Sequence, residues 1–167
     1  RVSAGKFLMG NEKYKYQNPE HALIIPYNYW MSRHPVTNHL YNTYKRSMGD
    51  ASSSLHFGED NDPVTHISWH DAVKYCQWLS NIFRNELPSS MILRLPTEAE
   101  WEKAARGVDG REYPWGNVFD INKCNTKESG MMGITLVDYY SPQGDSPYGC
   151  YEMAGKVWEL TNSLFKD

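Results

Sequence analysis

The sequence has no long hydrophobic run, few cysteines and no excess of charge of one sign, and each absence excludes a class of protein. No uninterrupted apolar stretch approaches the roughly 18 residues that a membrane-spanning helix needs, so we expect no membrane span. The net charge is −3, from 17 basic and 20 acidic residues, which disfavours a nucleic-acid partner. The first residues also lack the apolar core of a secretory signal peptide.

The cysteines are too few and too widely spaced for a disulfide framework, and none lies in a CxxC motif for zinc or redox chemistry. Cys76, Cys124 and Cys150 are therefore predicted to be mostly buried free thiols. Unpaired cysteines favour a reducing compartment such as the cytoplasm.

What the sequence does have is enough apolar surface for a core. Hydrophobic residues make up 40% of the 167 residues and aromatic residues 14%, including 12 Tyr and 6 Trp. A chain of this length can bury roughly 70% of the surface that it exposes when unfolded. The composition therefore predicts a folded globular domain rather than a disordered chain.

Hydrophobic spacing and capping signals predict three helices. Thr37 is a good N-cap for a helix over 37–48. Apolar residues three and four apart predict a second helix over 69–84. Thr97 and Glu100 form a capping-box pattern, which predicts a third helix over 97–106.

Short strands are predicted over 5–10, 22–31 and 91–95, and Pro26 marks an edge or a bulge in the second. Residues 108–150 are rich in glycine, aspartate and proline and show no helical period, so this segment is predicted to be irregular but tied down. Together these elements predict the mixed α/β class with little regular structure.

Several residue patterns suggest chemistry, but each also has a structural explanation. His66 and His70 have the spacing of a zinc site on a helix, yet the helix is predicted to start only near Trp69, which favours ordinary surface or capping histidines. Glu98, Glu100 and Glu102 resemble a glycosidase carboxylate pair, but acidic side chains in the first turn of a helix complement its dipole.

The aromatic residues also allow two interpretations. A carbohydrate platform needs several exposed rings, whereas tryptophans are more often part of a core, and we predict a core position for Trp69, Trp78, Trp101, Trp115 and Trp158. Tyrosines among Gly, Ser and Asp suit adaptable recognition, and the residues predicted to form an exposed binding surface are Tyr139, Tyr140, Tyr148 and Tyr151.

An ordered set of motifs gives the most specific signal, and it covers essentially all 167 residues. In this order and spacing the motifs resemble the formylglycine-generating enzyme (sulfatase-modifying factor) family. They are Phe7-Leu8-Met9-Gly10, His34-Pro35-Val36-Thr37-Asn38, Pro63-Val64-Thr65-His66-Ile67-Ser68-Trp69, Tyr75-Cys76-Gln77-Trp78-Leu79-Ser80, Arg94-Leu95-Pro96-Thr97-Glu98-Ala99-Glu100-Trp101-Glu102, Tyr113-Pro114-Trp115-Gly116-Asn117, Cys124-Asn125-Thr126 and Met153-Ala154-Gly155-Lys156-Val157-Trp158-Glu159.

This resemblance implies a variant of the C-type-lectin fold, with helices packed on small twisted antiparallel sheets. It also implies bound calcium, a hard cation that takes 6–8 oxygen ligands. The implied calcium ligands are Glu152, Gly155, Val157 and Glu159 at one site, and Asn125 and Thr126, with Asp138 available in the loop over 127–138, at a second.

The family's oxidases bind copper through two cysteines in a segment after the Val-Trp-Glu motif. Only eight residues follow Glu159 here, and no close cysteine pair occurs anywhere in the sequence. We therefore expect 1–167 to be a single domain of this type missing its C-terminal portion, and copper only if a further segment carries a cysteine pair.

Two functions remain open. The first is a non-catalytic module that binds a protein or small-molecule ligand, either as part of a larger bacterial protein or as one of the family's binders diversified by retroelements. The second is a fragment of a formylglycine-generating oxidase, which converts a substrate cysteine to formylglycine with copper and oxygen.

Overall fold

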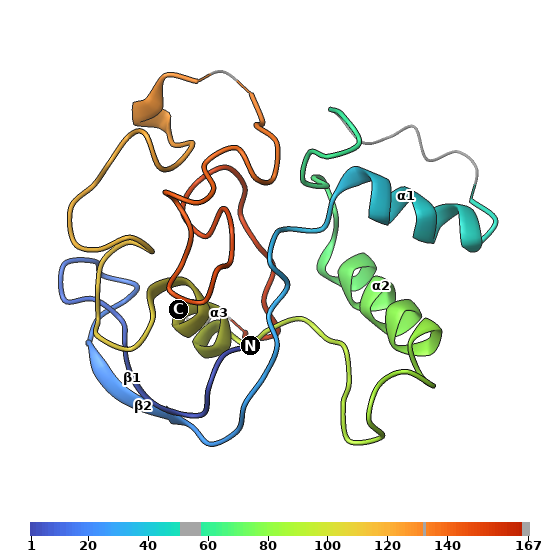
Figure 1. Ribbon diagram of the computed structural model, residues 1–167, viewed down its shortest axis with the longest axis horizontal. Coiled ribbons are helices and arrows are strands. Elements are labelled where there is room, and N and C mark those ends of the chain that lie inside the picture. Colours follow the sequence, from blue (N-terminus) through green and yellow to red (C-terminus); the bar gives the residue numbers. More distant parts are fainter. Residues whose placement is uncertain (51–57, 132, 165–167) are drawn as a thin grey trace.

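The computed structural model describes residues 1–50, 58–131 and 133–164, and Figure 1 shows how its elements are arranged. In chain order these are β1 (Gly5–Met9), β2 (His21–Ile25), α1 (Asn38–Ser47), α2 (Trp69–Ile82), α3 (Glu98–Arg106) and a short 3-10 helix (Lys127–Ser129). β1 and β2 form an antiparallel pair in which Phe7 lies opposite Leu23. The mixed α/β class predicted from the sequence is confirmed.

The three predicted helices are present, and local capping explains where they begin. The Thr37 hydroxyl accepts a hydrogen bond from the Leu40 N–H at the start of α1. Ser68 caps α2 in the same way. Thr97 and Glu100 form the predicted capping box at the start of α3, where each side chain accepts from the other residue's backbone N–H.

The strand predictions are confirmed for 5–10 and only partly for 22–31. β2 ends at Ile25, because Pro26 has no N–H to donate, and Tyr29 then pairs with Val2 in an isolated bridge. The strand predicted over 91–95 is wrong. The Ser80 hydroxyl bonds to both the N–H and the carbonyl of Leu93, so a side chain takes the place of a neighbouring strand.

The molecule has two lobes (Figure 1). The helical lobe consists of α1 and α2, and the main lobe of β1, β2, α3 and residues 108–164. Aromatic rings hold the helical lobe together: Tyr41, Tyr44 and Tyr75 have ring centroids 5.4–5.7 Å apart. Edge-on and tilted contacts of this kind stabilise beyond the area they bury.

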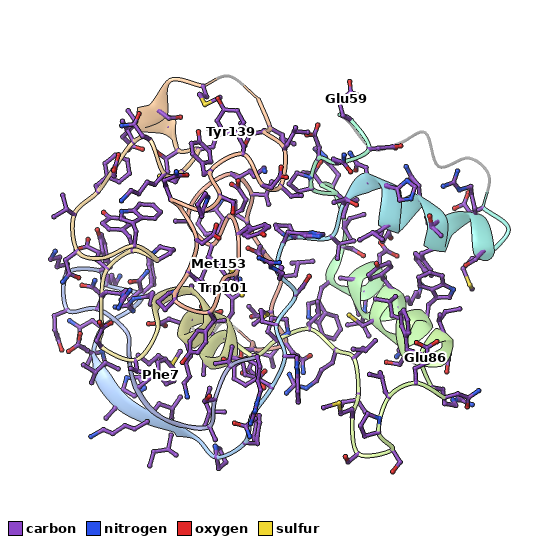
Figure 2. All side chains as sticks on the ribbon, viewed as in Figure 1. Phe7, Glu59, Glu86, Trp101, Tyr139 and Met153 are labelled. Carbon is purple, nitrogen blue, oxygen red and sulfur yellow. The ribbon has the colours of Figure 1, made fainter. Side chains whose placement is uncertain are left out.

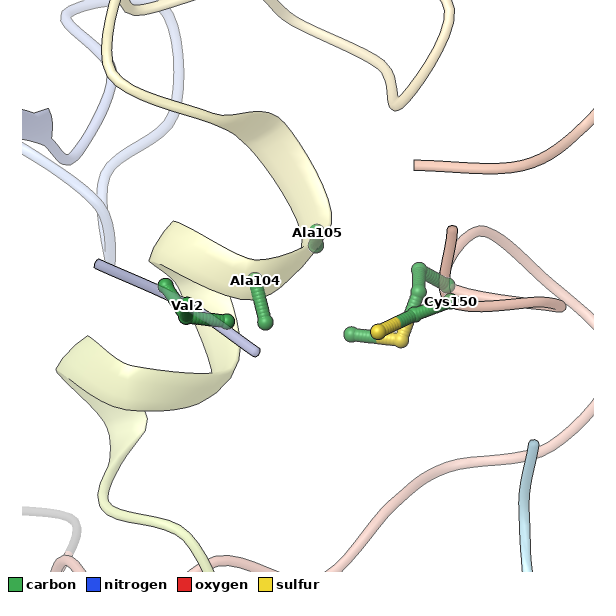
Figure 3. Close-up of a cluster of buried hydrophobic side chains, with 5 residues drawn as sticks. Val2, Ala104, Ala105 and Cys150 are labelled. Atoms are coloured by element: carbon green, nitrogen blue, oxygen red, sulfur yellow. The ribbon is translucent and has the colours of Figure 1, made fainter. Parts of the chain in front are cut away.

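The core of the main lobe forms around α3. Ala104 and Ala105 are fully buried between Val2, at the start of the chain, and Cys150 and Met153, which lie within residues 108–164 (Figure 3). Trp101 packs against the same cluster, and Figure 2 shows it next to Met153 in the middle of the lobe. α3 therefore joins the first residues of the chain to the loops that carry the candidate site.

Within residues 1–50, 58–131 and 133–164, no helix has the length and apolar character needed to cross a bilayer.

Candidate functional site

The two calcium sites implied by the resemblance are neighbours in the structure. Asn125 and Gly155 form an isolated parallel bridge, and the Lys156 N–H donates to the Asn125 carbonyl over 2.6 Å. A side chain at position 155 would meet this carbonyl, because an added Cβ would lie 2.4 Å from it. Glycine at position 155 therefore allows the two segments to touch.

The second predicted segment is already hydrogen-bonded within itself. The Asn125 side chain donates to the Gly133 carbonyl over 3.0 Å and accepts from the Ser129 hydroxyl over 3.3 Å. Thr126 precedes the 3-10 helix, and its carbonyl accepts from the N–H and the hydroxyl of Ser129. These bonds occupy part of the acceptor capacity of the Asn125 and Thr126 oxygens, while the Thr126 hydroxyl is buried without a hydrogen-bond partner.

Glu152 is the most unusual residue of the site. Its side chain is 1% exposed, neither carboxylate oxygen has a hydrogen-bond partner, and the Lys156 ammonium group lies 3.6 Å from one of them. Burial raises the pKa of Glu152, while the Lys156 charge and a backbone contact with Tyr140 act in the opposite direction. Burial likewise lowers the pKa of Lys156 against the opposing effect of Glu152.

Acidic groups also surround Lys156 at longer range. Asp62 and Asp138 both favour its charged form electrostatically, while the Asp138 charge raises the pKa of Glu152. The Lys156 ammonium group donates to the Leu136 carbonyl as well. Lys156 is thus the positive centre of an otherwise acidic part of the main lobe.

Glu159 lies at the other end of the predicted calcium set. The residue as a whole is exposed, although its carboxyl group is partly desolvated where it approaches Trp101. This desolvation raises the pKa of Glu159 to about 7, while Trp101 opposes the shift and the Glu152 charge adds to it. Val157 is half-buried, and its N–H donates to the Gly155 carbonyl over 2.9 Å.

These contacts test whether the residues suit calcium. A calcium ion bound to Glu152 would lie beside a buried ammonium group, so Glu152 does not fit the role of ligand while Lys156 is in place. The carbonyls of Asn125 and Gly155 already accept backbone hydrogen bonds. Calcium at Glu159 and the nearby carbonyl groups stays a prediction.

The three cysteines are separate free thiols, as the sequence predicts. Cys124 and Cys150 are buried, and Cys76 on α2 is half-buried. Burial raises the pKa of each thiol, so all three stay protonated at neutral pH.

The four tyrosines predicted to form one exposed surface have different environments. Tyr139 is exposed, whereas Tyr140 is 7% exposed because its ring packs edge-on against Tyr139 and its hydroxyl donates to the Met131 sulfur. Tyr148 is half-buried against the core around α3. Tyr151 is half-buried beneath the Arg33 guanidinium group, 4.9 Å from its ring centre.

Two of the tryptophans predicted to be core residues are exposed instead. Trp158 is fully exposed and lies in a stretch without regular structure. Trp69 is partly exposed, and its indole N–H donates to the Thr161 carbonyl. Trp78, Trp101 and Trp115 are half-buried.

The remaining candidate groups have structural partners. Glu100 binds Arg94 through two hydrogen bonds of 2.7 and 2.8 Å, and Glu102 pairs with Arg106. His66 precedes α2 with a φ of 58°, whereas His70 lies on the helix, so they do not share a helical face. Within the described ranges, no group of three or more His, Cys, Asp or Glu side chains is arranged to hold a metal.

Lys156 is the residue whose importance sequence reasoning missed. Its distance of four residues from Glu152 suggests an ion pair only on a helix, and this segment is not helical. The signal is therefore weak: a lysine within a motif that was expected to hold a cation.

Comparisons with known proteins agree with this fold. The chain is 41% identical over 115 residues to a Bos taurus protein named inactive C-alpha-formylglycine-generating enzyme 2, covering 62% of this chain and 34% of that protein. It is 38% identical over 133 residues to the formylglycine-generating enzyme of Mus musculus, covering 71% of this chain and 31% of that protein. The chain thus spans about a third of the length of these relatives.

Two solved structures share the fold over nearly the whole chain. PvdO from Pseudomonas aeruginosa superposes with a TM-score of 0.78 at 21% identity, covering 98% of this chain and 69% of that chain. Treponema denticola variable protein 1 superposes with a TM-score of 0.71 at 22% identity, covering 96% and 72%. The architecture is therefore the C-type-lectin-like fold that the motifs imply.

The family model described as the sulfatase-modifying factor enzyme 1-like domain matches residues 1–167. Because this match spans the whole sequence, the chain belongs to the sulfatase-modifying factor family.

Proposed function

We propose that these 167 residues form a binding module of the sulfatase-modifying factor family, which recognises a protein or small-molecule partner and has no oxidase chemistry of its own. One observation carries the proposal: the three cysteines are free thiols, none of them paired, and burial raises the pKa of each. Copper(I) needs soft thiolate ligands, and a two-thiolate site needs two of them close together.

The relatives support both this proposal and its alternative. Identity of 41% to a protein named as inactive favours a binding role, whereas identity of 42% over 113 residues to the formylglycine-generating enzyme of Thermomonospora curvata favours the oxidase. The alternative is therefore a fragment of an oxidase that converts a substrate cysteine to formylglycine with copper and oxygen. More narrowly, the binding module would be part of a larger bacterial protein or one of the family's binders diversified by retroelements.

Exposed aromatic side chains are the residues that we assign to partner contact. Tyr139 and Trp158 are both exposed, and the segments that carry them meet where Lys156 binds the Leu136 carbonyl. Figure 2 shows Tyr139 near the edge of the main lobe. Large rigid rings supply contact area at a low cost in conformational entropy.

Incubating the chain with a cysteine-containing sulfatase-type peptide, copper and oxygen distinguishes the two functions. The binding proposal expects the peptide mass to stay unchanged at the cysteine. Turnover of the peptide would overturn it. Tryptophan fluorescence, measured as the peptide is added to the chain, reports whether the peptide binds. The same measurement on Trp158→Ala shows whether the exposed Trp158 ring contributes to this binding.

Calcium concerns the stability of the module and is separate from its binding role. A calcium ion held by Glu159 and the carbonyl groups of Gly155 and Val157 is one proposal for what stabilises the irregular segment. The buried ion pair between Glu152 and Lys156 is another candidate source of stability for this segment.

A further inference from the structure

We propose that the Lys156 ammonium group is a built-in counter-ion that occupies the place of a metal ion beside Glu152, so that this part of the domain folds without calcium. The Lys156 side chain is 0% exposed and that of Glu152 is 1% exposed, with 3.6 Å between the nitrogen and the nearer carboxylate oxygen. The pair is thus fully enclosed by the protein.

Glu152 needs a positive partner at this position. Neither of its carboxylate oxygens has a hydrogen-bond partner, and an isolated buried carboxylate is strongly unfavourable. Among the described residues, Lys156 is the cation that pairs with it. Removing this cation would leave the carboxylate to be protonated or to find another positive ion.

The Lys156 contacts resemble those of a bound cation because they join segments that are distant in the sequence. The ammonium group lies between the Glu152 carboxylate and the Leu136 carbonyl, while the Lys156 N–H donates to the Asn125 carbonyl. One residue therefore ties together three parts of the irregular segment. A structural metal ion often has this role in loops with little regular structure.

The backbone conformations of Glu152 and Lys156 indicate that the surrounding structure fixes the positions of both residues. Glu152 has a φ of 58° and Lys156 a φ of 66°, and both conformations are unfavourable for residues with a side chain. Such strain persists only where the surrounding contacts fix it. Here the strained backbone accompanies two side chains that both point into the interior.

The surrounding charges favour the charged form of Lys156. Asp138 and Asp62 act on Lys156 from a distance, and neither is in ion-pair contact with it. Calcium would bring two charges and require 6–8 oxygens, whereas the ammonium group needs only a few acceptors. With Lys156 in place, calcium would meet a like charge beside its expected ligand Glu152.

Thermal unfolding in excess calcium and in chelator tests the proposal. We expect the same midpoint for the native chain under both conditions. Lys156→Met removes the charge but keeps most of the length of the side chain, and it should lower the midpoint in chelator by roughly 10 °C. Adding Glu152→Gln to Lys156→Met should recover part of this loss, because no buried charge is then left unpaired.

The pair between Lys123 and Asp120 is a matched control. It has the same separation of 3.6 Å, but its side chains are 30% and 36% exposed. Lys123→Met should change the midpoint by no more than about 2 °C, and Asp120→Asn should add little, because water already solvates these charges.

Terbium luminescence sensitised by tryptophan gives a second measurement. We expect no saturable terbium signal from the native chain, and a signal that calcium displaces only after Lys156→Met. If Lys156→Met does not fold, the thermal midpoint of Glu152→Gln tests the ion pair instead, because this variant leaves Lys156 without its ionic partner and should lower the midpoint. A native chain that calcium stabilises, or an unchanged midpoint in Glu152→Gln, would overturn the proposal.

Discussion

Residues 1–107 and residues 108–164 differ sharply in how they are held together. The first region contains all three helices and the β1–β2 pair, whereas the described part of the second contains only one short 3-10 helix. The second region nevertheless buries polar residues such as Asn125 and Glu152. Its order therefore comes from single turns and from a few contacts between distant residues rather than from the repeated hydrogen bonds of a helix or sheet.

One basic side chain on α3 connects the two regions, and a second ties α3 to the start of the chain. Arg106 donates to the carbonyls of Gly10 and Gly110, one from each region, and pairs with Glu102. Lys103, which is 1% exposed, donates to the carbonyls of Ser3 and Gly5 over 2.8 and 2.9 Å. The irregular region therefore depends on a helix that lies outside it.

The largest effect is expected for Arg106→Ala. The substitution leaves the carbonyls of Gly10 and Gly110 without this donor and the Glu102 carboxylate without its ionic partner. Removing one member of a buried ionic network should lower the free energy of unfolding by about 3–5 kcal/mol, as measured by urea denaturation. Arg84→Ala is the control, because Arg84 is exposed and its guanidinium group donates to the neighbouring Asn81 side chain. A loss below about 1 kcal/mol for Arg106→Ala would contradict the connecting role.

Gly155→Ala should have the next largest effect, and it tests the contact within the irregular region. Gly155 has a φ of +89°, and an added Cβ would lie 2.4 Å from the Asn125 carbonyl oxygen. Backbone strain and the clash together should cost about 3 kcal/mol. Gly149→Ala separates the two causes, because Gly149 has a φ of +72° but open space around an added Cβ. Equal losses for the two variants would show that the Asn125–Gly155 contact contributes nothing.

Glu100→Gln should have a smaller effect that depends on pH. Burial opposes ionisation of Glu100, but Arg94 and the Thr97 backbone outweigh it and lower the pKa from 4.5 to about 2. This lowering of the pKa corresponds to about 3 kcal/mol at neutral pH, and the glutamine variant keeps part of it because its amide oxygen still accepts hydrogen bonds. Because the folded pKa lies below the unfolded one, this stabilisation is present above pH 4.5 and is lost as the pH falls towards 2.

Urea denaturation of the native chain and of Glu100→Gln across this pH range measures the effect. The difference between their free energies of unfolding should shrink as the solution becomes more acidic. Glu86→Gln is the control, because Glu86 is exposed on the turn after α2. A difference that does not change with pH would mean that the Glu100 charge is not the source of its stabilising effect.

The sequence predicted the first region well because its signals are local. The caps at Thr37 and Thr97 involve residues only three positions apart, and a motif of that size can be recognised in a sequence. The strand predicted over 91–95 failed because Ser80 takes the backbone bonds of Leu93 from thirteen positions away. Nothing local in the sequence marks that contact.

The candidate site shows the same limit. The resemblance identified Asn125, Glu152 and Gly155 as important, but it placed Asn125 at a site separate from the other two. Asn125 and Gly155 are brought together by a parallel bridge between residues that lie thirty positions apart in the sequence. The pairing of Glu152 with Lys156 depends on two left-handed backbone conformations, which ordinary residues adopt rarely and which no sequence pattern here predicts.

The smallest effect on stability is expected for Trp158→Ala, at the exposed end of the irregular region. Trp158 is fully exposed, so its removal should change the free energy of unfolding by less than about 0.5 kcal/mol in urea denaturation. Trp101→Ala provides the contrast, because Trp101 packs against the core around α3 and its loss should cost about 3 kcal/mol. Iodide should quench the Trp158 fluorescence component readily, since water reaches the whole ring. A destabilisation by Trp158→Ala as large as that by Trp101→Ala would mean that the Trp158 ring is packed in solution, and the partner-contact role proposed for it would then be wrong.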